Sequence, residues 1–200
     1  MHIAEFEGVP DEPFRIKFSD QDQSRSDYWR RINFSLDGWR VLHEYCNEKG
    51  VEFLCTPFSV EAARTLYENR LVKRWKIGSG QAVDWPLIDY VSDTGLPLII
   101  STGLISNAEI LLLRERLTRL GSWKQTTLLH CVSKYPVKET EIDFHLMDDL
   151  RILGCKVGYS SHSSNWLIPL YAIAQGAEVV EVHMTPHRKF FGPDVTSSIS

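Results

Sequence analysis

The feature of the sequence that most limits the possible folds is a repeated alternation of short apolar runs with segments of helical spacing. From residue 51 onward the unit recurs about every 22–29 residues, the length of a strand plus its crossover helix. The runs are apolar throughout rather than alternating, which is typical of parallel strands covered by helices. The six predicted strands are VEFLCTPF (51–58), RWKIGSG (74–80), PLIISTG (97–103), TTLLHCVS (126–133), KVGYSS (156–161) and VVEVHMT (179–185).

Helix boundary signals support this division of the chain. Ser35 precedes a segment in which Trp39, Leu42 and Cys46 recur at helical spacing, and Gly50 ends it. The residues before Ser35 are turn-rich or highly polar, which predicts a long surface loop with a short helical piece. We therefore divide the chain into an irregular N-terminal region, residues 1–34, and an α/β domain, residues 35–200.

A barrel and an open doubly wound sheet both fit six parallel strands. The phosphate-binding pattern G-x-G-x-x-G of the open fold is absent, since GSGQAVDW has only the first two glycines. Nearly every predicted strand ends in polar side chains, and in barrels the functional groups come from the carboxyl ends of many strands. An open sheet gathers them at one switch point instead. The pattern favours a (β/α)8 TIM-barrel type of fold of which six units are visible.

Charge and cysteine usage narrow the function classes. The formal charge is −4 and no basic run is present, which argues against general nucleic-acid or membrane-surface binding. No stretch approaches the ~18 apolar residues of a membrane span. The cysteines are scattered and form no C-x-x-C pair, which favours a reducing compartment, and we expect the cytoplasm. They are Cys46, Cys55, Cys131 and Cys155.

Two histidines stand at the ends of consecutive predicted strands. Ser160 and His162 share one face of their strand, and Glu181 and His183 share one face of the next. Two imidazoles with open coordination positions can hold a divalent cation that also binds a substrate oxygen. The alternative is that both histidines are hydrogen-bonded core residues. We favour the metal for the pair, with Glu181 one layer deeper, either as a partner behind the metal ligands or as a counter-charge to Lys76.

Hydroxyl groups follow four of the strands, with one lysine among them. Ser79, Ser101, Ser133 and Ser160 together with Lys76 offer the donors that a phosphate or carboxylate requires. The alternative is that these serines only cap the helices that follow. Glycine beside the hydroxyl in GSG and STG allows a ligand to approach the backbone, which favours an anion site.

Several motifs together resemble the sialic acid (N-acetylneuraminate) synthase family. They occur in the family's order and spacing over residues 51–200, and HIAEFEGVPDEP resembles the loop after the family's second barrel strand. The combination is specific, although each motif alone is not. The motifs are TPFS, KIGSGQAVDWPLI, LPLIISTG, LLHCVSKYP, GYSSHS, GAEVVEVHMT and GPD.

The resemblance implies a reaction and a set of site residues. A family member condenses phosphoenolpyruvate with an N-acyl-mannosamine-type sugar, giving a sialic-acid-like nonulosonate and phosphate. His162 and His183 would hold a divalent metal, Mn or Mg, and Lys76, His183 and Asp194 would be the catalytic residues. Full-length members are expected to be homodimers. The positions implied to bind substrate are Thr56, Ser79, Gln81, Ser101, Ser133, Tyr135 and Ser160.

The sequence departs from the family at three points. Gln81 stands where Glu is common, and Ser161 stands where an Asp could orient His162. The family's first two strands and its C-terminal antifreeze-like domain have no counterpart, so the predicted strands correspond to barrel strands 3 to 8. Lys17 is the nearest candidate for a lysine that the second strand would bring. We expect a member shortened at both ends, with no turnover by this chain alone.

Two other functions remain open from the sequence. The chain could be a non-catalytic fragment, or a sugar-phosphate-binding relic of the same family. It could also act on a dideoxy-diacetamido sugar, as a legionaminic or pseudaminic acid synthase.

Overall fold

The computed structural model describes residues 1–3, 7–9, 11–14 and 21–200 and contains one parallel sheet of five strands. The strands follow their sequence order across the sheet, so every connection passes to the next neighbour. The strands are β1 (Trp75–Ile77), β2 (Leu98–Ser101), β3 (Thr126–Cys131), β4 (Lys156–Ser161) and β5 (Val180–Val182).

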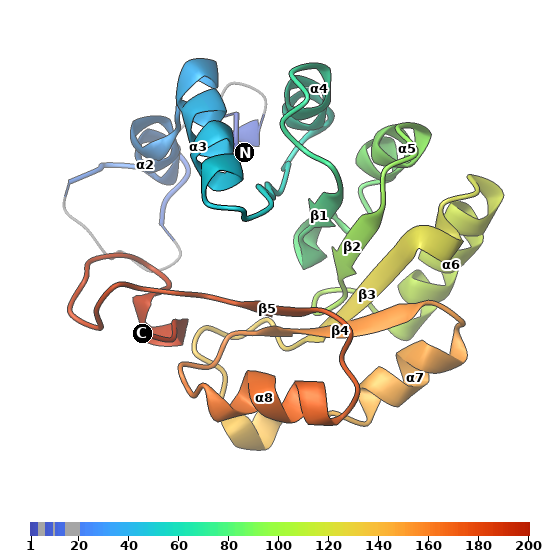
Figure 1. Cartoon of the computed structure of the whole chain (residues 1–200). Coiled ribbons are helices and arrows are strands. Elements are labelled where there is room, and N and C mark those ends of the chain that lie inside the picture. The colour runs from blue at the N-terminus through green and yellow to red at the C-terminus, as the bar shows by residue number, and fades with distance from the viewer. Residues whose placement is uncertain (4–6, 10, 15–20) are drawn as a thin grey trace.

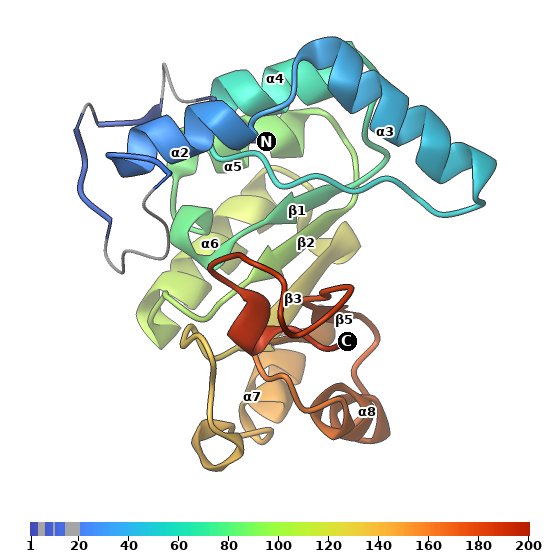
Figure 2. The ribbon, with the colours of Figure 1, turned by 90° about the vertical axis from the view of Figure 1, so that its left-hand side faces the viewer.

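Helices alternate with these strands and follow one another around the outside of the sheet (Figure 1). Two further helices precede them near the N-terminus (Figure 2). The early helices are α2 (Arg25–Ile32), α3 (Leu36–Glu48) and α4 (Val60–Glu68). The later ones are α5 (Trp85–Asp93), α6 (Asn107–Arg119), α7 (Leu146–Ile152) and α8 (Leu167–Ala174). Short 3-10 turns are η1 (Ser79–Gln81), η2 (Trp123–Gln125), η3 (Glu139–Glu141) and η4 (Val195–Ser197).

Local capping explains where the predicted helices begin and end. The hydroxyl of Ser35 accepts a hydrogen bond from the backbone N–H of Gly38, and Ser106 forms a capping box with Glu109. Gly50 lies past the end of α3 with a φ of +68°, a conformation that side chains disfavour. The helical piece expected in the N-terminal region is α2, capped by Ser24.

The sheet is strongly curled. β1 and β5 lie at opposite ends of the strand order, and four strand spacings in a flat sheet would separate them by about 19 Å. Yet Nζ of Lys76 on β1 lies 3.5 Å from Oε2 of Glu181 on β5. Only a sheet that curves around a common interior brings these side chains together, which confirms the incomplete barrel type of fold.

The prediction of a strand at residues 51–58 is wrong. Residues 51–57 have no strand pairing, and β1 pairs only with β2 among the described residues. An apolar run becomes a strand only when a neighbour accepts its backbone hydrogen bonds. Five of the six expected strands are therefore present, and residues 51–58 lead into α4 as extended chain.

Alternation along the strands separates a helix-packed face from an interior face. Trp75, Ile77, Leu98, Ile100 and Leu128 are buried beneath the helices and form much of the core. The opposite face carries Lys76 and Ser101, and at its far end Cys131, Ser160 and Glu181 stand in register on adjacent strands. The polar interior face predicted from the strand ends is therefore present.

Candidate functional site

A cavity of about 760 Å³ opens at the carboxyl ends of the five strands. It brings together every predicted site residue except Asp194, whose carboxylate lies 3.9 Å from Nδ1 of His183. Residues from all five strands or their ends contribute, as the barrel interpretation requires. The lining residues are Arg25, Thr56, Phe58, Lys76, Gly78, Ser79, Gly80, Gln81, Ser101, Leu104, Cys131, Ser133, Tyr135, Ser160, His162, Glu181, Val182 and His183.

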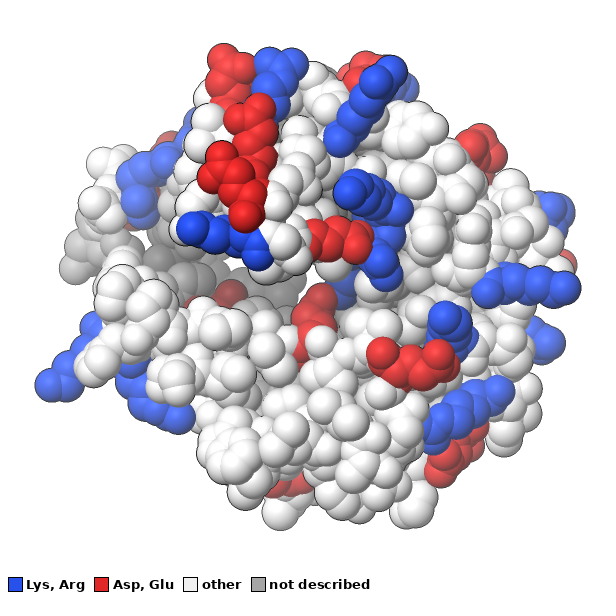
Figure 3. Space-filling model, in the orientation of Figure 1, with Lys and Arg blue, Asp and Glu red and all other residues white. Residues whose placement is uncertain are grey.

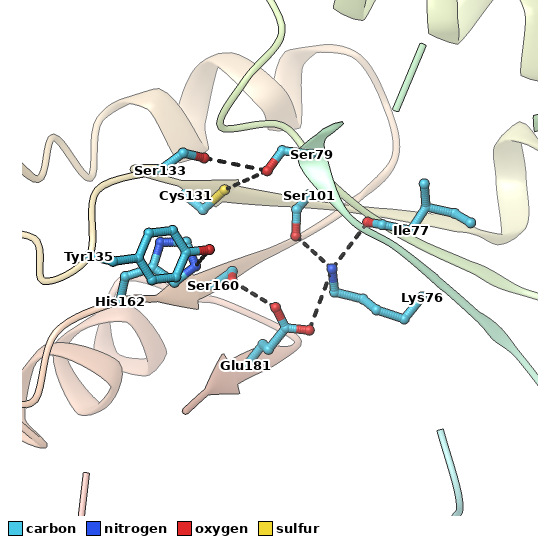
Figure 4. Close-up of polar contacts among 10 residues, drawn as sticks. All are labelled: Lys76, Ile77, Ser79, Ser101, Cys131, Ser133, Tyr135, Ser160, His162 and Glu181. Atoms are coloured by element: carbon cyan, nitrogen blue, oxygen red, sulfur yellow. Dashed lines mark hydrogen bonds and ion pairs between the residues drawn. The ribbon is translucent and has the colours of Figure 1, made fainter. Parts of the chain in front are cut away.

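The ammonium of Lys76 is the most buried positive charge lining the cavity (Figure 4). It donates to the hydroxyl of Ser101 at 2.8 Å and to the carbonyl of Ile77 at 3.1 Å. Glu181 balances its charge at 3.5 Å and also accepts a hydrogen bond from Ser160 at 2.7 Å. The residue is only 5% exposed, so these partners offset the cost of burying a charge. The sequence-based expectation of a lysine among hydroxyls is met in its geometry.

A second group of small polar side chains lies beside this lysine. The hydroxyl of Ser79 is 3.4 Å from that of Ser133 and 3.9 Å from the sulfur of Cys131 (Figure 4). The backbone at Gly103 packs so closely that a Cβ there would lie 2.6 Å from Oγ of Ser133. Glycine at this position therefore leaves the room that the Ser133 hydroxyl occupies. These hydroxyls and Lys76 together form a compact set of hydrogen-bond donors for an anion.

His162 is held in one orientation by both ring nitrogens. Nδ1 lies 2.7 Å from the carbonyl oxygen of Val132, and Nε2 lies 2.9 Å from the hydroxyl of Tyr135 (Figure 4). Because a carbonyl can only accept, Nδ1 carries the proton and Nε2 presents its lone pair. Burial lowers the pKa of His162, so the ring is neutral at pH 7. The Val132 carbonyl does the orienting that an Asp at position 161 would do, and Ser161 is buried.

Tyr135 covers the same imidazole. Its ring stacks on His162 with centroids 4.0 Å apart and meets His183 edge-on at 5.7 Å. Burial, with smaller contributions from Asp194, Cys131 and Glu181, raises the pKa of Tyr135 to about 12. The phenol therefore stays protonated and donates its hydrogen to Nε2 of His162.

The two histidines predicted to bind metal lie next to each other. Their ring centroids are 5.4 Å apart, a separation that two imidazoles bound to one ion at ~2.0–2.1 Å per bond can span. In the described part of the chain, no group of three or more His, Cys, Asp or Glu side chains is arranged as a complete metal site. The neutral imidazole of His162 and the neighbouring His183 fit a divalent ion that takes its other ligands from substrate or water.

Sequence reasoning missed Arg25. It lines the cavity from α2, outside the sheet, whereas the polar strand ends and the family motifs mark residues on or after the strands. Its guanidinium stacks over Trp29, with Cζ 4.2 Å from the ring centroid, and donates to Glu12 at 2.9 Å. Lys17, the lysine expected to come from this region, lies outside the described residues.

The surface carries charges of both signs. On the face shown in Figure 3, Lys and Arg side chains are interspersed with Asp and Glu rather than gathered in one field. No helix in the described ranges has both the length and the apolar character needed to cross a bilayer.

The curled parallel sheet and its polar cavity define a barrel-type α/β protein in which a buried lysine and several hydroxyls lie beside a pair of imidazoles. A sequence model of the NeuB family matches residues 5–200, and the chain belongs to that family. The family resemblance inferred from the motifs is thereby confirmed.

Relatives and a solved structure agree with this assignment. The N,N'-diacetyllegionaminic acid synthase of Campylobacter jejuni is 31% identical over 94% of this chain and 56% of its own length. The human N-acetylneuraminate-9-phosphate synthase is 27% identical over 94% of this chain and 52% of its own. The sialic acid synthetase of Leptospira borgpetersenii, solved with citrate, aligns with a TM-score of 0.82 and 31% identity over 90% of this chain and 62% of that one. The chain spans about half the length of the curated relatives it matches.

Proposed function

We propose that this chain carries the substrate-binding interior of a nonulosonate synthase, which condenses phosphoenolpyruvate with an N-acyl-mannosamine-type sugar. The observation that carries the proposal is the cavity in which a buried lysine, four serine hydroxyls and two adjacent histidines converge. Membership of the NeuB family and the names of the relatives support the same reaction class.

The cavity suggests where phosphoenolpyruvate binds. Lys76 and Ser101 supply an ammonium and a hydroxyl 2.8 Å apart, which suit a phosphate or carboxylate oxygen. Ser79 and Ser133 lie within hydrogen-bond range of each other and offer further donors. In the proposed reaction, carbon three of phosphoenolpyruvate forms a bond to the sugar aldehyde carbon. Water then adds to carbon two and phosphate leaves, so the products are the nonulosonate and inorganic phosphate.

The opposite end of the cavity suits the sugar. Tyr135 keeps its proton and, when it leaves Nε2 of His162, can donate it to a sugar oxygen. Asp194 stands beside His183 to accept from a sugar hydroxyl. A bound Mn²⁺ or Mg²⁺ would be held by His162 and His183, and it would polarise the aldehyde oxygen. Gln81 and Thr56 add neutral hydrogen-bonding groups to the lining.

The acceptor sugar belongs to one of two chemical classes. The Campylobacter relative is named for a diacetamido product without phosphate, and the human relative is named for a 9-phosphate product. Their identities to this chain, 31% and 27%, are too close to decide between a neutral and a phosphorylated sugar. The four cysteines are free, which supports a cytoplasmic location for this chemistry.

The test is to mix the full chain with phosphoenolpyruvate, an N-acylmannosamine and Mn²⁺ and to follow phosphate release. Release that needs both substrates and is abolished in Lys76→Met supports the synthase. Because no turnover is expected of this chain alone, phosphoenolpyruvate binding by calorimetry without release still supports the synthase interior if the sugar also binds in the presence of Mn²⁺. Phosphoenolpyruvate binding without sugar binding would support the second candidate, a non-catalytic binding relic. The observation behind that candidate is the cavity, because a cavity that binds an anion does not by itself give turnover. No binding and no release would contradict both.

A further inference from the structure

Arg25 is a positive charge on the cavity wall that the proposed reaction leaves without a role. Lys76 rises from β1 on the sheet side, whereas Arg25 is the first residue of α2. Lys76 is bound to Ser101, Ile77 and Glu181, whereas the side chain of Arg25 pairs with Glu12. The cavity therefore has two separate cationic positions on different elements.

The surroundings of Arg25 hold its guanidinium in place. The ring of Trp29, one turn along α2, lies under its plane, with Cζ 4.2 Å from the centroid. The backbone N–H of Arg25 donates to the carbonyl of Glu12 at 2.9 Å, and its side chain donates to the carboxylate of the same residue at 2.9 Å. A stacked and anchored guanidinium loses little freedom when an anion binds, because its donors are already oriented.

The carboxylate of Glu12 accepts a hydrogen bond from the same guanidinium that an anionic ligand group would bind. Glu12 and Arg25 retain 32% and 30% of their side-chain exposure, so the pair is open to solvent and exchangeable. An ion pair at this exposure contributes little on its own, whereas a phosphate with two negative charges offers more acceptor oxygens than one carboxylate. A phosphorylated ligand can therefore displace Glu12 from the guanidinium.

We propose that Arg25 is a specificity-determining residue that selects an acceptor sugar carrying a terminal phosphate. The inference rests on the proposed function and decides between the two acceptor classes it leaves open. Lys76 with Ser101, and Ser79 with Ser133, already provide donors for the phosphate and the carboxylate of phosphoenolpyruvate. The second cation is therefore left for an anionic group of the sugar. The neutral sugar has no group that would exchange with Glu12.

The test is a calorimetric titration of the full chain with N-acetylmannosamine 6-phosphate and with N-acetylmannosamine, without phosphoenolpyruvate. We expect the 6-phosphate to bind about tenfold tighter, as one charge-assisted hydrogen bond allows. Arg25→Gln should abolish this preference. Arg30→Gln is the matched control, because Arg30 lies on the same helix, is 52% exposed and pairs only loosely with Asp27 at 3.5 Å. It should keep the preference.

Glu12→Gln gives a result in the opposite direction. It removes the internal competitor of the ligand while Arg25 stays in place, so the 6-phosphate should bind several-fold tighter and the neutral sugar should not change. If the ion pair had only a structural role, both variants would instead bind both sugars more weakly. This gain in affinity also tests the inference if Arg25→Gln does not fold.

Three results would overturn the inference. The first is equal binding of the two sugars, or no binding of the 6-phosphate, by the wild-type chain. The second is an equal loss for both sugars in Arg25→Gln. The third is an Arg25→Gln effect on a parallel titration with phosphoenolpyruvate alone, which would assign Arg25 to that substrate. Because none of these titrations depends on phosphate release, failure of the synthase proposal stays distinguishable.

Discussion

The phenol of Tyr135 donates its hydrogen to Nε2 of His162 at 2.9 Å while its ring stacks on the same imidazole. Nε2 is the ring nitrogen of His162 with a lone pair for a metal ion, and it already accepts this hydrogen bond. A divalent ion must displace this hydroxyl before it can bond to Nε2.

Tyr135→Phe should therefore strengthen metal binding. The substitution removes the competing hydrogen bond, worth about 0.5–1.5 kcal/mol, and keeps the stacked ring. We expect Mn²⁺ affinity to rise about twofold to tenfold, measured by calorimetry or by the electron paramagnetic resonance of free Mn²⁺. His162→Gln should abolish the binding. Unchanged or weaker Mn²⁺ binding in Tyr135→Phe would show that the hydroxyl supports the ion rather than competing with it.

Lys76 and Glu181 should be energetically coupled. Lys76→Met leaves Glu181 without its cation, and Glu181→Gln leaves the buried ammonium without a carboxylate at 3.5 Å. For groups in direct contact, a double-mutant cycle in the free energy of unfolding should give a coupling of about 1–3 kcal/mol. Urea unfolding of the wild type, the two single variants and the double variant measures it. Additive effects would show that the pair does not join the two edge strands energetically.

Gly103→Ala should damage the anion site, whereas Gly80→Ala should not. A Cβ on Gly103 would lie 2.4 Å from Sγ of Cys131 and 2.8 Å from its backbone oxygen, and the backbone cannot move as a side chain can. Overpacking of this kind costs about 1–3 kcal/mol and would displace Ser133 from Ser79. A Cβ on Gly80, which also lines the cavity, meets nothing within 4 Å. Thermal unfolding and phosphoenolpyruvate titration of the two variants test the contrast.

The Asp89–Arg116 ion pair should make stability depend on acidic pH. Arg116 donates to both carboxylate oxygens, at 2.6 and 2.5 Å, and this hydrogen bonding lowers the pKa of Asp89 below its ordinary value. An acid with a lowered pKa in the folded state stabilises the fold above its unfolded pKa. That stability is lost as the pH falls through the folded value. Both groups keep contact with solvent, so the contribution is modest.

Unfolding in urea at pH 7 and at pH 3 measures this effect. Asp89→Asn should lose stability at pH 7 and lose less than the wild type on acidification. Arg116→Gln should reduce the pH dependence in the same way, because it removes the cause of the lowered pKa. An unchanged difference between the two pH values in both variants would contradict the assignment.

Features set by local sequence could be predicted, and those set by distant contacts could not. Ser35 and Gly50 bound α3 as expected, since capping depends on a few neighbouring residues. Residues 51–58 have the composition of a strand, but a strand also needs a partner, which composition does not supply. Parallel strands place their carboxyl ends at one edge of the sheet, so the strand ends could be aligned from the sequence. For this reason the sequence predicts that Lys76 and Ser160 belong to the same site.

The missed and refined features of the site come from loops and helices. Arg25 reaches the cavity from α2, whose position relative to the sheet is not encoded in any local pattern. The orientation of His162 by the carbonyl of Val132, thirty residues away, depends on how the loop after β3 packs on β4. The family resemblance indicated that Tyr135 binds substrate. The stacking of its ring on His162 is a three-dimensional contact that the sequence does not show.

The contact between Lys76 on β1 and Glu181 on β5 joins the two edge strands of the sheet, so it links the charge of the cavity to its width. A ligand anion that binds Lys76 competes with the carboxylate of Glu181, which joins the two edge strands β1 and β5. Glu181 then keeps its hydrogen bond from Ser160. An exchange of partners at Nζ of Lys76 thus removes a contact between the two edge strands of the curled sheet. Ligand affinity and the radius of curvature of the sheet are therefore thermodynamically linked, and a substitution that widens the arc should alter anion binding without touching the anion.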